Sequence, residues 1–231
     1  MARDFVTAII MAAGMGRRMN RPVPKQFIHL RNKPIFIYTL EIFLDHPHVD
    51  AVVLVVPPAY LKKAEQLVKM FIREPVYAVV PGGERRQDSV FNGLAHLPQE
   101  TGIILIQDGV RPFVTPNHIT EVIEEAARHG AAVLGIPVSN TIKRGFSGWV
   151  EETLNRDTLW EIQTPQGFNR KVLADAYEAA IRENITFTDD AALVERAGHR
   201  VRLVHGDSLN IKITSPEDLI LAEAILNRRE A

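Results

Sequence analysis

The chain has 231 residues, of which 46% are hydrophobic and 24% charged, and its formal net charge is −1. These values favour one globular domain spanning residues 1–231 and exclude a strongly basic nucleic-acid binder. The absence of cysteine excludes disulfides, thiolate nucleophiles and cysteine-ligated metal sites. No apolar run approaches the roughly 20 residues of a membrane helix, and no signal-peptide pattern precedes the first strand-like run. We therefore expect a cytoplasmic enzyme or binding protein with no nucleic-acid or membrane partner.

Short apolar runs alternate along the chain with segments of helical periodicity. Uninterrupted apolar runs are typical of strands buried on both faces, and they occur at Val6–Ala12, Ala51–Pro57, Val76–Pro81, Ile103–Asp108, Ala131–Pro137 and Val201–His205. Helices are predicted at Pro34–Leu44, Ala59–Phe71, Asp88–Leu97, Pro116–His129, Arg170–Glu183 and Ser215–Arg228. The alternation predicts a three-layer α/β/α sandwich around a mostly parallel, Rossmann-like sheet.

The segment at about 139–159 departs from this alternation. Thr141–Arg144 and Val150–Leu154 are predicted to be two short strands joined by a glycine-containing turn, which indicates a β-hairpin arm. Trp149 and Val150 lie at its tip, where a protruding hairpin exposes them to water. Two interpretations remain open: the tip folds back onto the main body, or it contacts a partner subunit.

The first strand ends in a glycine-rich loop at residues 12–19, AAGMGRRM. Gly14 and Gly16 allow a sharp turn that brings backbone N–H groups close to phosphates, although neither the dinucleotide fingerprint nor the Walker motif is complete. Arg17, Arg18 and Lys25 add positive charge, which suits a nucleoside triphosphate with Mg²⁺. The alternative is a simple turn with solvated arginines. The loop follows the carboxyl end of a strand, and this position favours the interpretation as a ligand site.

Three further clusters occupy comparable places. Residues 82–89, GGERRQDS, form a second cationic loop at a helix start. Asp108 follows a strand and suits either Mg²⁺, a ribose hydroxyl or an ordinary turn. Lys212 is an isolated cation in an apolar stretch and is either functional or a strand residue with its charge in water. No acyl-transfer motif or zinc pattern appears.

Together these motifs resemble the cytidylyltransferases of the non-mevalonate isoprenoid pathway, which act on 2-C-methyl-D-erythritol 4-phosphate. The matching segments span nearly the whole chain: residues 12–19, 24–26 (PKQ), 83–89, 108–112 (DGVRP), 155–160 (NRDTLW), 164–166 (TPQ), 188–189 (TD) and 210–214 (NIKIT). The sequence departs at residues 109–110, where the family more often has two alanines. The ribitol-phosphate cytidylyltransferases share this departure and remain an alternative.

The resemblance implies that CTP and methylerythritol phosphate give a CDP-alcohol and pyrophosphate with Mg²⁺, in a homodimer whose arms reach across a two-fold axis. It implies four catalytic residues: Arg18, Lys25, Arg156 and Lys212. For CTP it implies Ala12, Ala13, Gly14, Met15, Gly16, Gly83, Glu84, Arg86, Ser89 and Asp108, with Asp108 also the metal candidate. For the polyol phosphate it implies Asp108, Arg111, Thr141, Arg156, Thr164, Thr188 and Lys212.

Two alternatives come from other classes of protein. A nicotinamide dehydrogenase needs an acidic residue after the second strand, where this chain has Pro57 and Pro58. A non-catalytic nucleotide-binding module needs the glycines but has no use for Lys25, Arg156 and Lys212 together.

Overall fold

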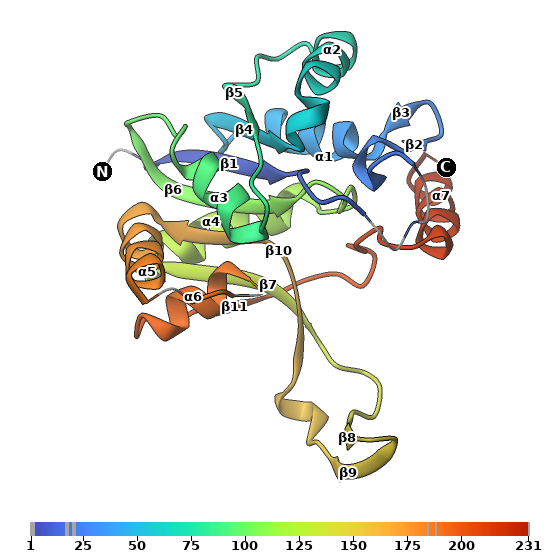
Figure 1. The fold of residues 1–231 in the computed structure, drawn as a ribbon, viewed down its shortest axis with the longest axis vertical. Helices are drawn as coiled ribbons and strands as arrows, with labels where there is room; N and C mark the ends of the chain where they lie inside the picture. Colours follow the sequence, from blue (N-terminus) through green and yellow to red (C-terminus); the bar gives the residue numbers. More distant parts are fainter. Residues whose placement is uncertain (1–2, 17–18, 20–21, 184, 188, 231) are drawn as a thin grey trace.

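The computed structural model describes residues 3–16, 19, 22–183, 185–187 and 189–230, and a seven-stranded sheet runs through its centre (Figure 1). The strand order is β11-β7-β10-β6-β1-β4-β5. The strands are β1 (Phe5–Met11), β4 (Ala51–Val56), β5 (Ala78–Pro81), β6 (Thr101–Asp108), β7 (Ala131–Pro137), β10 (Trp160–Asn169) and β11 (Arg202–His205). Strand β10 is antiparallel to β6 and β7, whereas the other paired strands of this sheet are parallel.

Helices cover both faces of this sheet because successive strand residues point to opposite faces. On β1, Ala8 and Ile10 pack in one core with α1 (Ile35–Leu44), α2 (Leu61–Phe71) and α4 (Pro116–His129). Ile9 packs in the other core with α3 (Arg86–Leu94), α5 (Arg170–Glu183) and α6 (Asp190–Arg196). The predicted three-layer sandwich with a mostly parallel sheet is therefore confirmed.

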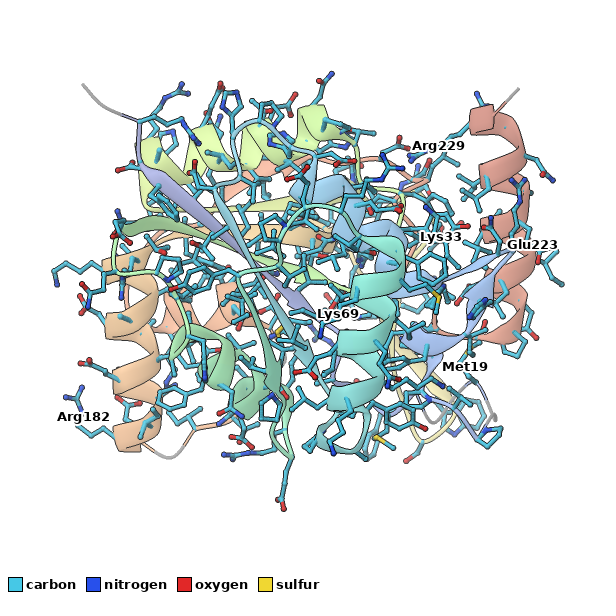
Figure 2. All side chains as sticks on the ribbon, turned by 90° about the horizontal axis from the view of Figure 1, so that it is seen from above. Met19, Lys33, Lys69, Arg182, Glu223 and Arg229 are labelled. Carbon is cyan, nitrogen blue, oxygen red and sulfur yellow. The ribbon has the colours of Figure 1, made fainter. Side chains whose placement is uncertain are left out.

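The last helix, α7 (Pro216–Glu230), packs in a third cluster with Leu30 of the short β2 (His29–Leu30). Figure 2 shows α5 with Arg182 and α7 with Glu223 at opposite ends of a molecule whose interior is filled with side chains. The remaining short elements are η2 (Lys25–Phe27), β3 (Lys33–Pro34), η3 (Pro58–Tyr60) and η4 (Arg156–Thr158). Within the described ranges, no helix combines the length and the apolar character needed to cross a membrane.

The arm is a two-stranded hairpin of β8 (Lys143–Phe146) and β9 (Trp149–Thr153) that extends away from the sheet (Figure 1). Ser147 (φ 49°) and Gly148 (φ 84°) form a two-residue turn with positive φ at both positions. Because this turn is shorter than predicted, the first strand extends to Phe146 and the second begins at Trp149. The first strand also begins later than predicted, at Lys143 instead of Thr141. At the tip, Trp149 is 79% exposed, so of the two interpretations the one in which the tip folds back onto the main body is wrong.

Candidate active site

A cleft opens where four parallel strands end at one edge of the sheet. The register pairs Met11 of β1 with Val55 and with Asp108, and Val56 with Pro81, so the loops that follow these strands meet. The cleft has a volume of about 390 Å³. Its lining residues are Met11, Ala12, Ala13, Gly14, Met15, Lys25, Gln26, Pro57, Pro58, Gly83, Glu84, Arg85, Arg86, Ser89, Asp108, Val110 and Lys212.

The first loop, residues 12–16, is held in place by Gln26, which is buried beneath it. The Gln26 side-chain amide donates to the carbonyl oxygens of Ala12 and, at 3.0 Å, of Gly14. Gly16 has φ of +64°, and a Cβ there would lie 3.0 Å from both the backbone nitrogen and Cγ of Lys25. Glycine therefore lets the loop lie directly on η2, and this contact brings Lys25 to the cleft.

The second loop, between β5 and α3, is also shaped by close backbone approach. A Cβ on Gly83 would lie 2.4 Å from the Cβ of Asp88, which excludes a side chain at this position. The Gly83 N–H donates to the Ser89 hydroxyl at 3.0 Å, and that hydroxyl donates to the Arg85 carbonyl at 3.1 Å. The Arg85 N–H donates to Asp88 at 3.0 Å and completes the helix start. Ser89 is buried, so its direct effect is on the shape of the loop.

Asp108, the last residue of β6, lies between two cations in the cleft. One of its oxygens is 2.7 Å from Lys212 Nζ and 3.5 Å from Arg111 Nε. Burial alone raises the pKa of a carboxyl group, but Lys212 and then Arg111 outweigh this effect and hold the pKa of Asp108 below its usual range. Asp108 is therefore ionised at neutral pH and restrains Lys212 in the cleft.

A buried polar network fixes the loop that carries Lys212. Arg111 donates to the Asn210 carbonyl at 2.7 Å, and the Asn210 side-chain amide donates to the Thr164 carbonyl at 3.0 Å. The Asp108 N–H donates to the Thr164 hydroxyl, also at 3.0 Å. These bonds join β6, β10 and the residue 210–214 segment into one support for the cleft. Arg111 and Thr164 belong to this support and do not line the cleft themselves.

Two predicted site residues lie on the arm and do not line this cleft. Thr141 and Arg156 are exposed, and Arg156 Nη1 donates to the Ser139 carbonyl at 2.6 Å, within the arm itself. Arg18 and Thr188 fall outside the described residues. The predicted residues that the structure describes thus fall into two sets, a cleft set on the sheet edge and an arm set.

Sequence reasoning missed three residues that organise the cleft: Gln26, Asn210 and Asp190. Gln26 and Asn210 stand inside recognised motifs but were given no role, because nothing local distinguishes a buried amide from an exposed one. Asp190 pairs with Arg86, 2.6 Å away, across more than 100 residues of sequence. Two features of the sequence could have indicated this pair: Arg86 is a cation just before a predicted helix, and Asp189 and Asp190 are adjacent carboxylates without an assigned role.

The family model of 2-C-methyl-D-erythritol 4-phosphate cytidylyltransferases (IspD) matches residues 6–228. The chain belongs to this family. A relative from Geobacillus kaustophilus with that name is 46% identical over 97% of this chain and 98% of its own length. A second, from Desulforamulus reducens, is 43% identical over 97% of both chains. The resemblance found in the motifs and the expectation of a nucleotidyltransferase enzyme are thereby confirmed.

Solved structures of the family have the same fold. The crystal structure of 4-diphosphocytidyl-2C-methyl-D-erythritol synthase from Anaerococcus prevotii superposes with a TM-score of 0.85, at 31% identity over 97% of this chain and 96% of that one. The 2-C-methyl-D-erythritol 4-phosphate cytidylyltransferase of Thermus thermophilus gives 0.78 at 32% identity, over 96% and 99% of the two chains. The likeness extends over nearly the whole chain.

Proposed function

We propose that this enzyme transfers CMP from CTP to the phosphate of 2-C-methyl-D-erythritol 4-phosphate and releases pyrophosphate, as a step of isoprenoid precursor synthesis. The observation that carries the proposal is the convergence of a glycine-rich backbone loop with Lys25, Arg86 and Lys212 in one cleft. Such a cleft suits a polyanionic nucleotide, and the relatives named above carry this activity in their names.

The reaction needs charge and orientation more than an enzyme nucleophile. A phosphate oxygen of the polyol attacks the α-phosphorus of CTP in line, the new O–P bond forms, and the bond to the β-phosphate oxygen breaks. The attacking phosphate oxygen of the polyol is already anionic at pH 7, so no base is required. Catalysis then consists of positioning the substrates and stabilising negative charge. We assign the α-phosphate contact to Lys25 and to Arg18.

The remaining predicted site residues are proposed to hold CTP and the second substrate. Residues 12–16, Gly83, Glu84, Arg86 and Ser89 supply or shape the nucleotide contacts. Lys212 binds the phosphate of the polyol together with Arg156, and the proposed supporting contacts come from Arg111, Thr141, Thr164 and Thr188.

We further propose that a divalent cation enters as Mg²⁺ bound to CTP. Within the described part of the chain, no three His, Asp or Glu side chains are grouped to hold a resident metal. Glu84 and Asp108 are the carboxylates that line the cleft, and Asp108 is already paired with two cations. These two carboxylates therefore fit a cation that is held mainly by phosphate oxygens, with Asp108 as its candidate protein ligand. The bound cation would neutralise charge on the phosphates.

We propose that the enzyme acts as a homodimer in which the arm, at about residues 139–159, reaches the partner's cleft. The arm carries Arg156 and Thr141 outside its own cleft, and its tip exposes Phe146, Trp149 and Val150. A two-fold dimer would cover these apolar side chains and complete both sites with one interface. A single domain and a cytoplasmic location are part of the same proposal, on the composition alone.

Pyrophosphate release from CTP tests the function, with three parallel reactions: methylerythritol phosphate, ribitol 5-phosphate and no acceptor. We expect release with the first only. Release with ribitol 5-phosphate at equal or higher kcat/KM would favour the ribitol enzyme. CTP binding without release under any condition would favour the non-catalytic nucleotide-binding module.

A further inference from the structure

The buried carboxylate of Asp190 links the second cleft loop to helices α5 and α6. Asp190, the first residue of α6, is 2% exposed, and each of its oxygens has one partner. Arg86 Nη2 lies 2.6 Å from Oδ2, and the Tyr177 hydroxyl donates to Oδ1 at 2.6 Å. Because a buried carboxylate is costly unless it is paired and hydrogen-bonded, these contacts specify one arrangement of the trio.

The backbone that carries Asp190 is itself attached to the central sheet. Gln166 of β10 donates to Asp189 at 3.3 Å and accepts from the Ala191 N–H at 3.2 Å. Asp189 also accepts from the Ala192 N–H at 2.9 Å, as the N-cap of α6. Asp190 therefore stands between two backbone positions that are both fixed, so its carboxylate is a rigid partner for Arg86.

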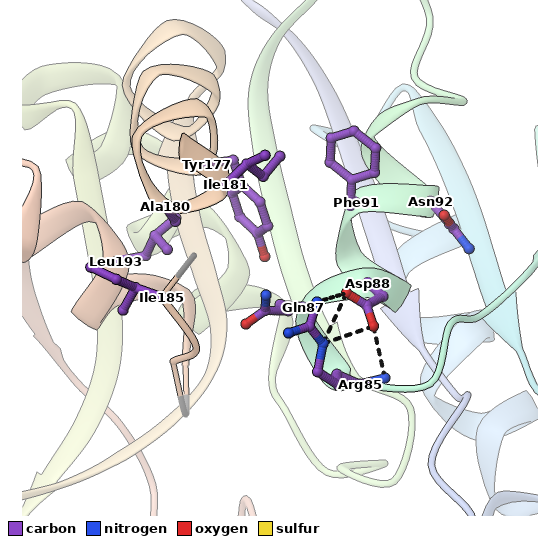
Figure 3. Close-up of a pocket in the computed structure, with 10 residues that line it drawn as sticks. All are labelled: Arg85, Gln87, Asp88, Phe91, Asn92, Tyr177, Ala180, Ile181, Ile185 and Leu193. Carbon is purple, nitrogen blue, oxygen red and sulfur yellow. Dashed lines mark hydrogen bonds and ion pairs between the residues drawn. The ribbon is translucent and has the colours of Figure 1, made fainter. Parts of the chain in front are cut away.

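Tyr177 approaches Asp190 from α5, beside a second, largely apolar cavity of about 200 Å³. Figure 3 shows Tyr177 and Ile181 of α5 facing Phe91 of α3 across this cavity. Burial, and then the charge of Asp190, raise the pKa of the Tyr177 hydroxyl, so it stays protonated and acts as the donor. The ring fills space while the hydroxyl satisfies the carboxylate.

Arg86 has one end in this buried trio and also lines the nucleotide cleft, with its side chain 32% exposed. Burial alone lowers the pKa of its guanidinium, but Asp190 outweighs this and raises it. A guanidinium has five N–H donors, so one edge can pair with Asp190 while others reach a phosphate. An arginine already held this way loses little further freedom when it binds an anion.

We propose that Asp190 and Tyr177 are positioning residues that aim the guanidinium of Arg86 at the phosphates of CTP. The inference rests on the proposed function, since the aim of Arg86 matters to turnover only if the cleft takes a nucleotide. The competing explanation is that the trio is a buried ion pair that contributes to folding alone.

Three variants separate these explanations: Asp190→Asn, Tyr177→Phe and, as a packing control on the same helix as Asp190, Leu193→Ala. We expect Asp190→Asn to raise the KM for CTP by about 10- to 100-fold, the range for one hydrogen bond to a charged group, with a much smaller change in kcat. Tyr177→Phe should raise it by a smaller factor. Leu193→Ala should lower the Tm and leave the KM for CTP within about twofold.

A double-mutant cycle with Arg86→Gln gives the decisive comparison. If Asp190 acts through Arg86, Asp190→Asn should raise the KM for CTP far less in the Arg86→Gln background than in the wild type. Equal effects in both backgrounds, or an Asp190→Asn enzyme with a lowered Tm and a normal KM for CTP, would overturn the proposal.

Crystal structures of the wild type and of Asp190→Asn provide a readout that needs no turnover. We expect the guanidinium of Arg86 to leave its place in the variant; an unchanged guanidinium overturns the positioning role even if the enzyme is active. A wild-type protein that does not turn over CTP would instead refute the proposed function, while the position of Arg86 would still test this inference.

Discussion

Mixing two inactive variants tests whether the arm completes the partner's site. Lys25 lines the cleft of its own chain, whereas Arg156 lies on the arm. Lys25→Ala should lower kcat by about 10²–10³, the scale for loss of one preorganised contact to developing charge. Arg156→Ala should also inactivate the homodimer, because both of its sites lose the arginine.

The expected recovery follows from two-fold symmetry. When Lys25→Ala and Arg156→Ala chains exchange freely at equal amounts, about half of the dimers are mixed. In a mixed dimer the Arg156→Ala chain supplies an intact cleft, and the Lys25→Ala chain supplies it with an intact arm. The other site has both defects. About a quarter of all sites, and so about a quarter of wild-type activity, should return.

A matched control uses two cleft residues. Lys25→Ala mixed with Lys212→Ala leaves one defect in every cleft whichever way the chains pair, so this mixture should stay inactive. Exchange is verified with a mass tag on one chain. If tagged mixed dimers of Lys25→Ala and Arg156→Ala form and remain inactive, the assignment of Arg156 to the partner's site is wrong.

Three further predictions concern the arm tip, Asp108 and the base. Trp149→Ser should weaken the dimer by about 1.5–3 kcal/mol, the value of one large buried apolar side chain, and so raise its dissociation constant more than tenfold in sedimentation; an unchanged constant would place the interface elsewhere. The pKa of Asp108 is lowered in the folded state, so ionised Asp108 stabilises the fold at pH values above its unfolded pKa of about 3.9. This contribution is lost as the pH falls through the pKa of the folded state. The Tm of Asp108→Asn should therefore lie below that of the wild type at pH 7 and the difference should shrink below pH 4; a constant difference contradicts this reasoning. CTP should be used with a much higher kcat/KM than ATP, since backbone polar groups around a small pocket leave a purine badly paired, and comparable values would refute it.

The sheet and its cleft could be predicted because their signals are local. Apolar runs such as Ala51–Val56 are buried along their whole length, and the glycine-rich segments follow β1 and β5 directly. Once strands alternate with helices, the parallel arrangement brings those loops to one edge. Arg86 and Asp108 line one cleft for this reason, and Lys25 and Lys212 join them through the contacts of η2 and of the residue 210–214 segment.

Strand β10 could not be predicted from the same signals. It contains Gln163, Pro165 and Gln166, which are not typical residues of a buried strand, yet residues 163–168 are all buried. Its polar side chains are paired through distant partners: Gln163 with Asn210, and Gln166 with the start of α6. Helix α6 was also missed, because its seven residues are too few to show a clear helical periodicity. The burial of its first residue, Asp190, depends on contacts with Arg86 and Tyr177, which are distant in the sequence.

The spacing of the motifs also does not predict that the site residues divide into a cleft set and an arm set. Arg156 and Lys212 were assigned to the same phosphate, and nothing in the order of the motifs separates them. In the structure, Lys212 pairs with Asp108 at the sheet edge, while Arg156 bonds to Ser139 at the base of an arm with an exposed apolar tip. A shared phosphate contact and this separation are compatible if the two residues come from different chains. The arm would then have two effects with one set of contacts: it buries Trp149 and it delivers Arg156, so a monomer should be inactive even with every cleft residue in place.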